Sequence, residues 1–337
     1  MTALNKLNYG NIGLMGISCL IAFYLPFDLF LFVYAVLGPA HYLTEISWLH
    51  QRKYFTKGKR DFILLGILAV LIFVSTYGLR QLKAFQTHDL WASLSNSLVF
   101  IAFFSALVLV TIKDGFARFA GIVMVCIGAL LARNFYVIFS IFLPTLVHVY
   151  VFTGLFVLYG AMKSKSKSGY LSFAVFLLIP VLFVVVDTSQ SVVSTYAHKT
   201  YSYFQTVNLK LYDMFRSPDA KLHDLGKIIF ESPLGLKIMR FIAFAYTYHY
   251  LNWFSKTTVI SWHKISKLRM GIIIILWVAS VGLYAWDYKI GFDWLFLLSV
   301  LHVFLEFPLN HTSFIGIWKE GWSLITGKPV PAMARNN

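Results

Sequence analysis

Long apolar runs recur along nearly the whole chain, and they constrain its fold more than any other feature. A helix needs about 20 apolar residues to cross the hydrocarbon core of a bilayer. Charged residues make up only 13 % of the chain, against about 25 % in a soluble domain. The sequence therefore predicts an all-α, polytopic transmembrane helical bundle of about ten spans. These spans centre near Ile21, Ala40, Ala69, Phe103, Val125, Val149, Leu178, Thr247, Leu276 and Val300.

Basic residues gather in alternate loops between the apolar runs. Residues 51–60 form the richest of these loops, and the net charge of the chain is +15. Positive loops favour the cytoplasmic side and attract anionic lipid heads. We therefore expect a multi-pass protein of a bacterial inner membrane with both termini in the cytoplasm. Membrane lipids are the expected partners, and nucleic acid is not.

We expect residues 1–337 to form a single transmembrane helical domain. One polar stretch, residues 188–237, interrupts the apolar pattern and contains Pro218 and Pro233. It is predicted to be an extramembrane insertion on the non-cytoplasmic face, between the seventh and eighth spans. A connecting loop is the favoured interpretation, and a lid is the alternative.

Two segments of the chain carry the same spacing, His-x3-Glu-x4-His, at residues 41–50 and 302–311. The repeat stands out because Glu occurs at only four positions in the chain. Residues four apart lie on one face of a helix. The first His and the Glu of each triplet can therefore bind the same metal ion. The third His points away on an unbroken helix. Pro308 can break the helix before His311, whereas no proline precedes His50.

The histidines fall into two layers along the predicted spans. Those at positions 41, 148, 249 and 302 lie near mid-span, and those at 50, 263 and 311 lie at the cytoplasmic ends. Placing an ionisable side chain in the hydrocarbon core costs free energy, so such residues usually have a function. Imidazole and carboxylate groups that lie together are best stabilised by binding a shared cation. The predicted metal ligands are His41, Glu45, His50, His148, His249, His263, His302, Glu306 and His311.

The residue types of this set favour non-haem iron over manganese and zinc, and no soft thiolate lies near. Two carboxylates with up to seven imidazoles favour two iron ions, and a single ion is the alternative. Aromatic residues surround His249 in the sequence. Tyr246, Tyr250 and Trp253 are candidates to line a pocket for a long apolar substrate. Ordinary packing or a membrane-interface belt is the alternative for these three.

The residues around several of the predicted histidine ligands resemble the motifs of a known protein family. The run Gly38-Pro39-Ala40-His41-Tyr42-Leu43-Thr44-Glu45 is similar to the GxPHGxxD opening of the Brp/Blh-type β-carotene 15,15′-dioxygenases of bacteria and archaea. His148 stands where that family has its second motif, and Tyr248-His249, His302 and His311 resemble its last two. The resemblance covers short patches of the chain. It implies a polytopic membrane enzyme whose histidine-bound non-haem iron splits an apolar polyene with dioxygen.

We therefore expect a metal-dependent oxidoreductase, an oxygenase or oxidase acting with dioxygen on a lipid-soluble substrate such as a polyene, carotenoid or fatty-acyl lipid. The sequence indicates no electron donor. Three alternatives stay open. A haem-binding redox protein would use mid-span histidines as axial pairs without Glu45 and Glu306. A metal- or proton-coupled transporter would need polar groups across the whole membrane, and a zinc-dependent hydrolase or transferase would lack its usual HExxH motif here.

Overall fold

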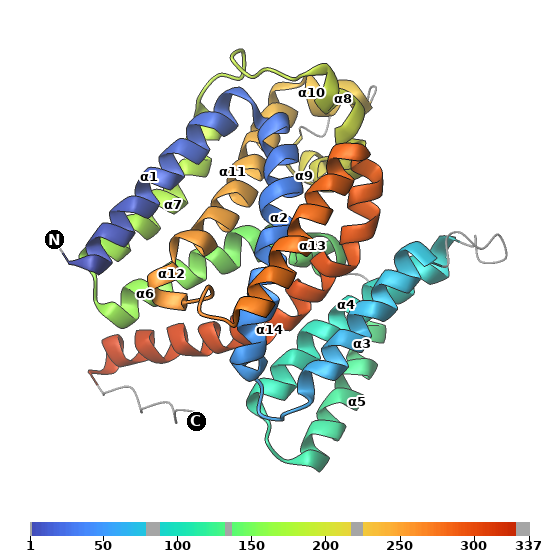
Figure 1. Cartoon of the computed structure of the whole chain (residues 1–337), viewed down its shortest axis with the longest axis vertical. Helices are drawn as coiled ribbons and strands as arrows, with labels where there is room; N and C mark the ends of the chain where they lie inside the picture. The colour runs from blue at the N-terminus through green and yellow to red at the C-terminus, as the bar shows by residue number, and fades with distance from the viewer. Residues whose placement is uncertain (1, 79–87, 132–136, 217–224, 328–337) are drawn as a thin grey trace.

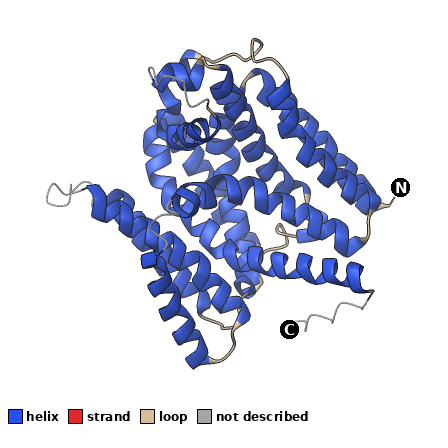
Figure 2. Ribbon diagram, turned by 180° about the vertical axis from the view of Figure 1, so that it is seen from behind, coloured by secondary structure: helices blue, strands red, loops and turns tan. Residues whose placement is uncertain are grey.

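The structure is a computed structural model that describes residues 2–78, 88–131, 137–216 and 225–327. All regular structure in these ranges is helical, which confirms the predicted all-α class (Figures 1 and 2). The α-helices are α1 (Ala3–Tyr24), α2 (Pro26–Gln51), α3 (Asp61–Phe73), α4 (His88–Thr111), α5 (Gly115–Leu131), α6 (Thr153–Ser164), α7 (Lys167–Val185), α8 (Thr195–Thr200), α9 (Gln205–Phe215), α10 (Leu225–Phe230), α11 (Pro233–Ser255), α12 (Thr257–Ile260), α13 (Lys267–Trp286) and α14 (Tyr288–Thr326). Shorter or wider helical turns are η1 (Lys53–Phe55), η2 (Val74–Gly78), η6 (Val137–Phe152) and η7 (Tyr201–Phe204).

Within the described ranges, seven helices are long and apolar enough to cross a membrane. Two shorter apolar helices cover Asp61–Thr76 and Gly115–Leu131. Apolar side chains such as Leu178 and Ile275 point outward, with 61 % and 69 % of their surface exposed. An apolar exterior of this kind is what lipid requires, so the chain is a membrane protein. The count of about ten spans and the placement of the termini stay predictions.

Helix α2 lies at the centre of the bundle, packed against α11, α13 and α14. Helices α1 and α7 pack against one another and against α11, while α3, α4 and α5 form a group on the other side of α14 (Figure 1). The last turns of α14, drawn in red, run across one end of the bundle toward the C-terminus. Helices α11 and α14 thus both pack against α2, and these three helices carry His249, His302 and His41.

Local sequence signals fix where these central helices begin. Ser232 caps α11 by accepting a hydrogen bond from the Gly235 N–H at 3.0 Å, and Pro233 occupies the first turn. Asp287 caps α14 in the same way, accepting from the Ile290 N–H at 2.9 Å. Polar caps satisfy N–H groups that lack a partner at a helix start. They therefore set the position of each histidine along its helix.

Gly38 allows α2 and α11 to approach closely. A Cβ atom at this position would lie 3.3 Å from the hydroxyl oxygens of both Tyr42 and Tyr250. Those two hydroxyls are 3.0 Å apart and hydrogen-bonded across the helix pair. A glycine one turn before His41 therefore brings α2 against the part of α11 that carries His249.

Residues 188–237, the predicted insertion, contribute α8, η7, α9 and α10 at one end of the bundle (Figure 1). Residues 217–224 lie outside the described ranges. The last part of the segment already belongs to α11, because Pro233 starts that helix rather than interrupting one. Helix α9 packs against α11 and η6, so the segment lies directly over helices that carry two of the histidines.

Candidate metal centre

Four histidines from four different helical segments meet in the core. His41 comes from α2, His148 from η6, His249 from α11 and His302 from α14. One ligand atom from each lies within 4.8 Å of the others, and all four residues are buried. These are the four histidines that the sequence places near mid-span. Of the described residues, only these four form a group of metal-ligand type.

The Nε2 atoms of the four imidazoles face one another in two pairs. The pair from His41 and His249 is 3.0 Å apart, and the pair from His148 and His302 is 3.2 Å apart. In a tetrahedral site with metal–nitrogen bonds of about 2.1 Å, neighbouring nitrogens lie about 3.4 Å apart. The distances within the two pairs are close to that value, and all four ligand atoms lie within 4.8 Å of one another. A single ion therefore fits this group if the two pairs move slightly closer together.

Two of the imidazoles are held on their outer side by hydrogen-bond partners. Thr153 Oγ1 lies 2.8 Å from His249 Nδ1. His302 Nδ1 donates to the Ser299 carbonyl at 2.5 Å, which leaves the Nε2 of His302 without a proton. Metal-binding histidines usually have such a partner on the nitrogen that faces away from the ion. Sequence reasoning missed Thr153 and Ser299, since hydroxyl residues and carbonyls are too common in helices to give a signal.

Two carboxylates flank the group in different ways. Glu45 Oε2 lies 3.0 Å from His41 Nε2, on the inner side where the imidazoles converge. Glu306 Oε2 lies 3.2 Å from His148 Nδ1, on the outer side. The two glutamates are each 2 % exposed. Glu45 is therefore placed to reach an ion in the group, whereas Glu306 is placed to orient His148.

Several buried polar atoms at this site lack a hydrogen-bond partner among the described residues. They are His41 Nδ1, His148 Nδ1, Glu45 Oε2 and Glu306 Oε2. The contacts of both glutamates with histidine are thus close in distance but not aligned as hydrogen bonds. A buried polar group without a partner costs about 1–3 kcal/mol, and more if it is charged. A cation at the centre would attract both carboxylates, so the residues present fit a metal ion.

Three predicted ligands lie outside the four-histidine group. His50 is exposed at the end of α2, with its Nδ1 3.3 Å from the Tyr54 hydroxyl. His263 is exposed in the loop after α12. His311 is buried, but its Nε2 donates to the Phe103 carbonyl at 3.0 Å. The predicted helix break at Pro308 is absent, because α14 continues through this residue. On an unbroken helix His311, five residues after Glu306, points to another face than Glu306.

The predicted aromatic residues surround the group. The Tyr250 ring is 5.3 Å from the His41 ring, and the Trp253 ring is 5.4 Å from it. Trp253 Nε1 donates to Thr44 Oγ1 at 3.0 Å. Tyr42, which sequence reasoning did not single out, stacks on the His302 ring at a centroid distance of 4.1 Å. These rings keep water away from the imidazoles on the side of α2 and α11.

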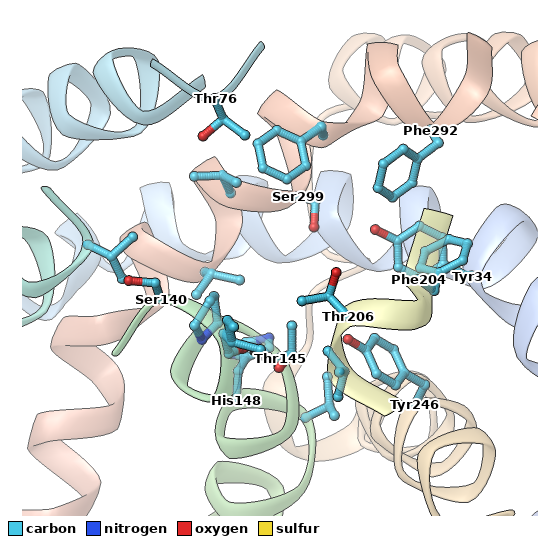
Figure 3. Close-up of a pocket in the computed structure, with 18 of the residues that line it drawn as sticks. Tyr34, Thr76, Ser140, Thr145, His148, Phe204, Thr206, Tyr246, Phe292 and Ser299 are labelled. Atoms are coloured by element: carbon cyan, nitrogen blue, oxygen red, sulfur yellow. Dashed lines mark hydrogen bonds between the residues drawn. The ribbon is translucent and has the colours of Figure 1, made fainter. Parts of the chain in front are cut away.

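A cavity of about 850 Å³ opens beside the four-histidine group. His148, His249 and His302 form part of its wall, and Tyr246 and Tyr250 also line it. Figure 3 shows His148 and Tyr246 at this wall. Trp253 is not part of the lining. Sites for single small molecules commonly have volumes of about 300–1,000 Å³. The histidines therefore adjoin a space large enough for a substrate.

The position of Glu306 gives a testable prediction. Replacing Glu306 with Gln keeps the shape of the side chain and removes the charge beside His148 Nδ1. We expect metal affinity to fall about 10–100-fold, as for other partners of metal-bound histidines. The measurement is metal titration of the purified protein. Glu320→Gln, on the same helix but outside the site, is the matched control, and equal affinities in the two variants would contradict the assignment.

Comparison of the chain with protein-family models, curated proteins and solved structures finds no match.

Proposed function

We propose that this chain is a membrane-embedded, non-haem iron oxygenase that acts on a lipid-soluble substrate in the cavity beside the four histidines. The observation that carries the proposal is the convergence of four imidazoles from four different helical segments, three of which line the wall of a cavity of about 850 Å³. A metal site that opens on such a space supports catalysis. A purely structural metal site is closed and does not require an adjoining cavity.

The donor set supports iron. Imidazole suits iron, copper, zinc and nickel, and the described part of the chain brings no thiolate to this group. Four imidazoles around a single point favour one ion rather than two. Iron held there would supply the activation of dioxygen.

The chain's own residues would do the rest of the work. His41, His148, His249 and His302 would hold the ion, and the partners at the outer nitrogens of His249 and His302 fix the orientations of those two rings. The aromatic walls exclude water, which protects reactive species and strengthens electrostatic interactions in the site. Glu45 adds a carboxylate within reach of the ion.

The haem alternative is disfavoured by the spacing of the rings. A haem needs its two axial nitrogens on opposite faces of a flat macrocycle. Ring centroids of His41 and His302 are 5.3 Å apart, and those of His148 and His249 are 4.9 Å apart. Two axial nitrogens lie about 4 Å apart, twice a metal–nitrogen bond of about 2 Å. A flat macrocycle between any one pair would overlap the other two imidazoles, because all four ligand atoms lie within 4.8 Å of one another. Zinc-dependent hydrolysis remains the second candidate, since the same imidazoles would bind zinc.

The test is elemental analysis of the protein purified in mild detergent, with an optical spectrum and a dioxygen electrode. We expect about one equivalent of iron, no Soret band, and dioxygen uptake that depends on added membrane lipid extract. Zinc as the only metal would move the assignment to hydrolysis. A Soret band, or no metal after reconstitution with ferrous iron, would overturn the proposal.

A further inference from the structure

Among the described residues, no charged side chain lines the cavity beside the four histidines. The described part of that wall is built from apolar, aromatic, hydroxyl, amide and imidazole groups. A divalent ion at the histidines would be balanced by the carboxylates of Glu45 and Glu306, which lie beside His41 and His148. A charged group brought into the cavity would then lose its hydration without gaining a counter-ion, which is strongly unfavourable. The occupant must therefore be uncharged, which disfavours free fatty acids and phospholipid head groups.

One end of the cavity is rich in hydroxyl and amide groups. This polar end is formed where η2, α4 and η6 meet, by Ser75, Thr76, Ser95, Asn96 and Ser140. Thr76 and Ser95 hydrogen-bond to each other at 3.1 Å. Ser140 Oγ is buried and has no hydrogen-bond partner among the described residues. A rotation of the Ser140 side chain that turns this Oγ into the cavity would let a neutral polar group there supply the partner.

The opposite end of the cavity is aromatic. This aromatic end holds Tyr34, Phe204, Tyr246 and Phe292, which lie across the cavity from Thr76 and Ser140 (Figure 3). The ring of Phe204 packs 4.8 Å from that of Tyr34 and 5.0 Å from that of Phe292. Ser299 and Thr206 add hydroxyls between the two ends. Aromatic faces of this kind bury a long apolar or unsaturated chain.

The segment between α7 and α11 completes the aromatic end. Tyr201, Tyr203 and Phe204 of η7, together with Thr206 and Val207 of α9, belong to the cavity wall. Tyr201 is fixed in place by its hydroxyl, which donates to Asn208 Oδ1 at 2.7 Å. The segment thus forms part of the wall of the cavity as well as connecting α7 to α11.

We propose that this cavity binds a neutral, single-headed lipid, a long-chain alcohol. Its hydroxyl group lies at the polar end, and its apolar chain passes the four histidines into the aromatic end. The inference deepens the proposed function by naming the substrate class, and it rests on that function only for the reaction, not for binding. An alcohol carries no charge, as the uncharged wall requires, and its hydroxyl group can form a hydrogen bond with Ser140. A pure hydrocarbon would leave Ser140 without a hydrogen-bond partner.

Three probes of equal chain length test this: octadecenol, octadecenoate and octadecene. Binding to the purified protein is measured in detergent by competition with radiolabelled octadecenol. We expect the alcohol to bind about tenfold more tightly than the alkene, which corresponds to about 1.4 kcal/mol. The carboxylate should bind more weakly than the alcohol. Equal binding of all three probes, or preference for the carboxylate or the alkene, would overturn the inference.

A pair of serine variants locates the hydroxyl group. Ser140→Ala should lower alcohol affinity about three- to tenfold and leave the affinity for octadecene unchanged. Ser105→Ala is the matched control, because Ser105 is also buried without a hydrogen-bond partner among the described residues but does not line the cavity. A loss of alcohol affinity that is equal in both variants would contradict the placement.

The same preparations separate this inference from the proposed function. Each binding measurement is made on metal-loaded protein and on protein treated with a chelator. If the protein holds iron but shows no preference for the alcohol, the substrate class is wrong and the oxygenase proposal stands. If it prefers the alcohol but never retains metal, the binding inference stands and the oxygenase proposal fails.

Discussion

Replacing His302 with Ala should abolish stoichiometric metal binding. Its Nε2 lies 3.2 Å from that of His148, and its Nδ1 is held by the Ser299 carbonyl. Removing one of four converging imidazoles deletes a ligand rather than an orienting partner. The loss of affinity should therefore exceed the roughly 100-fold upper range seen for such partners. Elemental analysis of the purified variant, after dialysis against a weak chelator, makes the measurement.

The control for this result is His263→Ala, in the exposed loop after α12. His249→Ala gives a second test from another helix, in case the loss of stacking between His302 and Tyr42 disturbs the fold. We expect His263→Ala to retain the metal and both core variants to lose it. Retention of a full equivalent by both core variants would remove the basis for a metal centre here.

Replacing Arg240 with Met should destabilise the fold by about 3 kcal/mol. Arg240 is fully buried in α11. Its Nε donates to Ser191 Oγ at 2.9 Å, its Nη1 donates to the Asp187 carbonyl at 2.9 Å, and its guanidinium lies 3.7 Å from the centre of the Phe23 ring. Met fills much of the same volume but leaves Ser191 and the carbonyl without their donor.

The stability measurement is thermal unfolding in detergent, where we expect a melting temperature lower by roughly 5–10 °C. Lys237→Met is the matched control, because Lys237 lies one turn earlier on α11 and donates to the Val184 carbonyl at 2.7 Å from an exposed position. An exposed hydrogen bond contributes little, so this variant should unfold near the wild-type temperature. Similar shifts in the two variants would show that Arg240 does not anchor the chain after α7 to α11.

Glu45 and Glu306 show which side-chain contacts can be predicted from the spacing of residues along a helix and which cannot. The four-residue interval predicts that Glu45 shares a face with His41, and the structure places their side chains 3.0 Å apart. The same interval links Glu306 to His302, yet Glu306 contacts His148 of another helix. Spacing fixes the face of a helix on which a side chain lies. It does not fix which neighbouring helix that face meets, because this depends on rotation and tilt in the bundle.

The sequence by itself determined the class of this protein and the depth of its histidines. Long apolar runs with few charges allow only a helical membrane bundle, because backbone groups in lipid must bond within their own segment. Counting residues from the ends of each run then places His41, His148, His249 and His302 near mid-span, and these are the four that the structure brings together.

Tertiary structure alone decided the composition of the group and its surroundings. His50, His263 and His311 repeat the same residue type, but they lie at helix ends or on faces that meet other partners. The cavity wall joins residues from η2, α4 and η6 with residues from η7, α9 and α11. Such contacts between distant segments follow from side-chain packing across helices. A pattern read along one helix at a time does not contain that information.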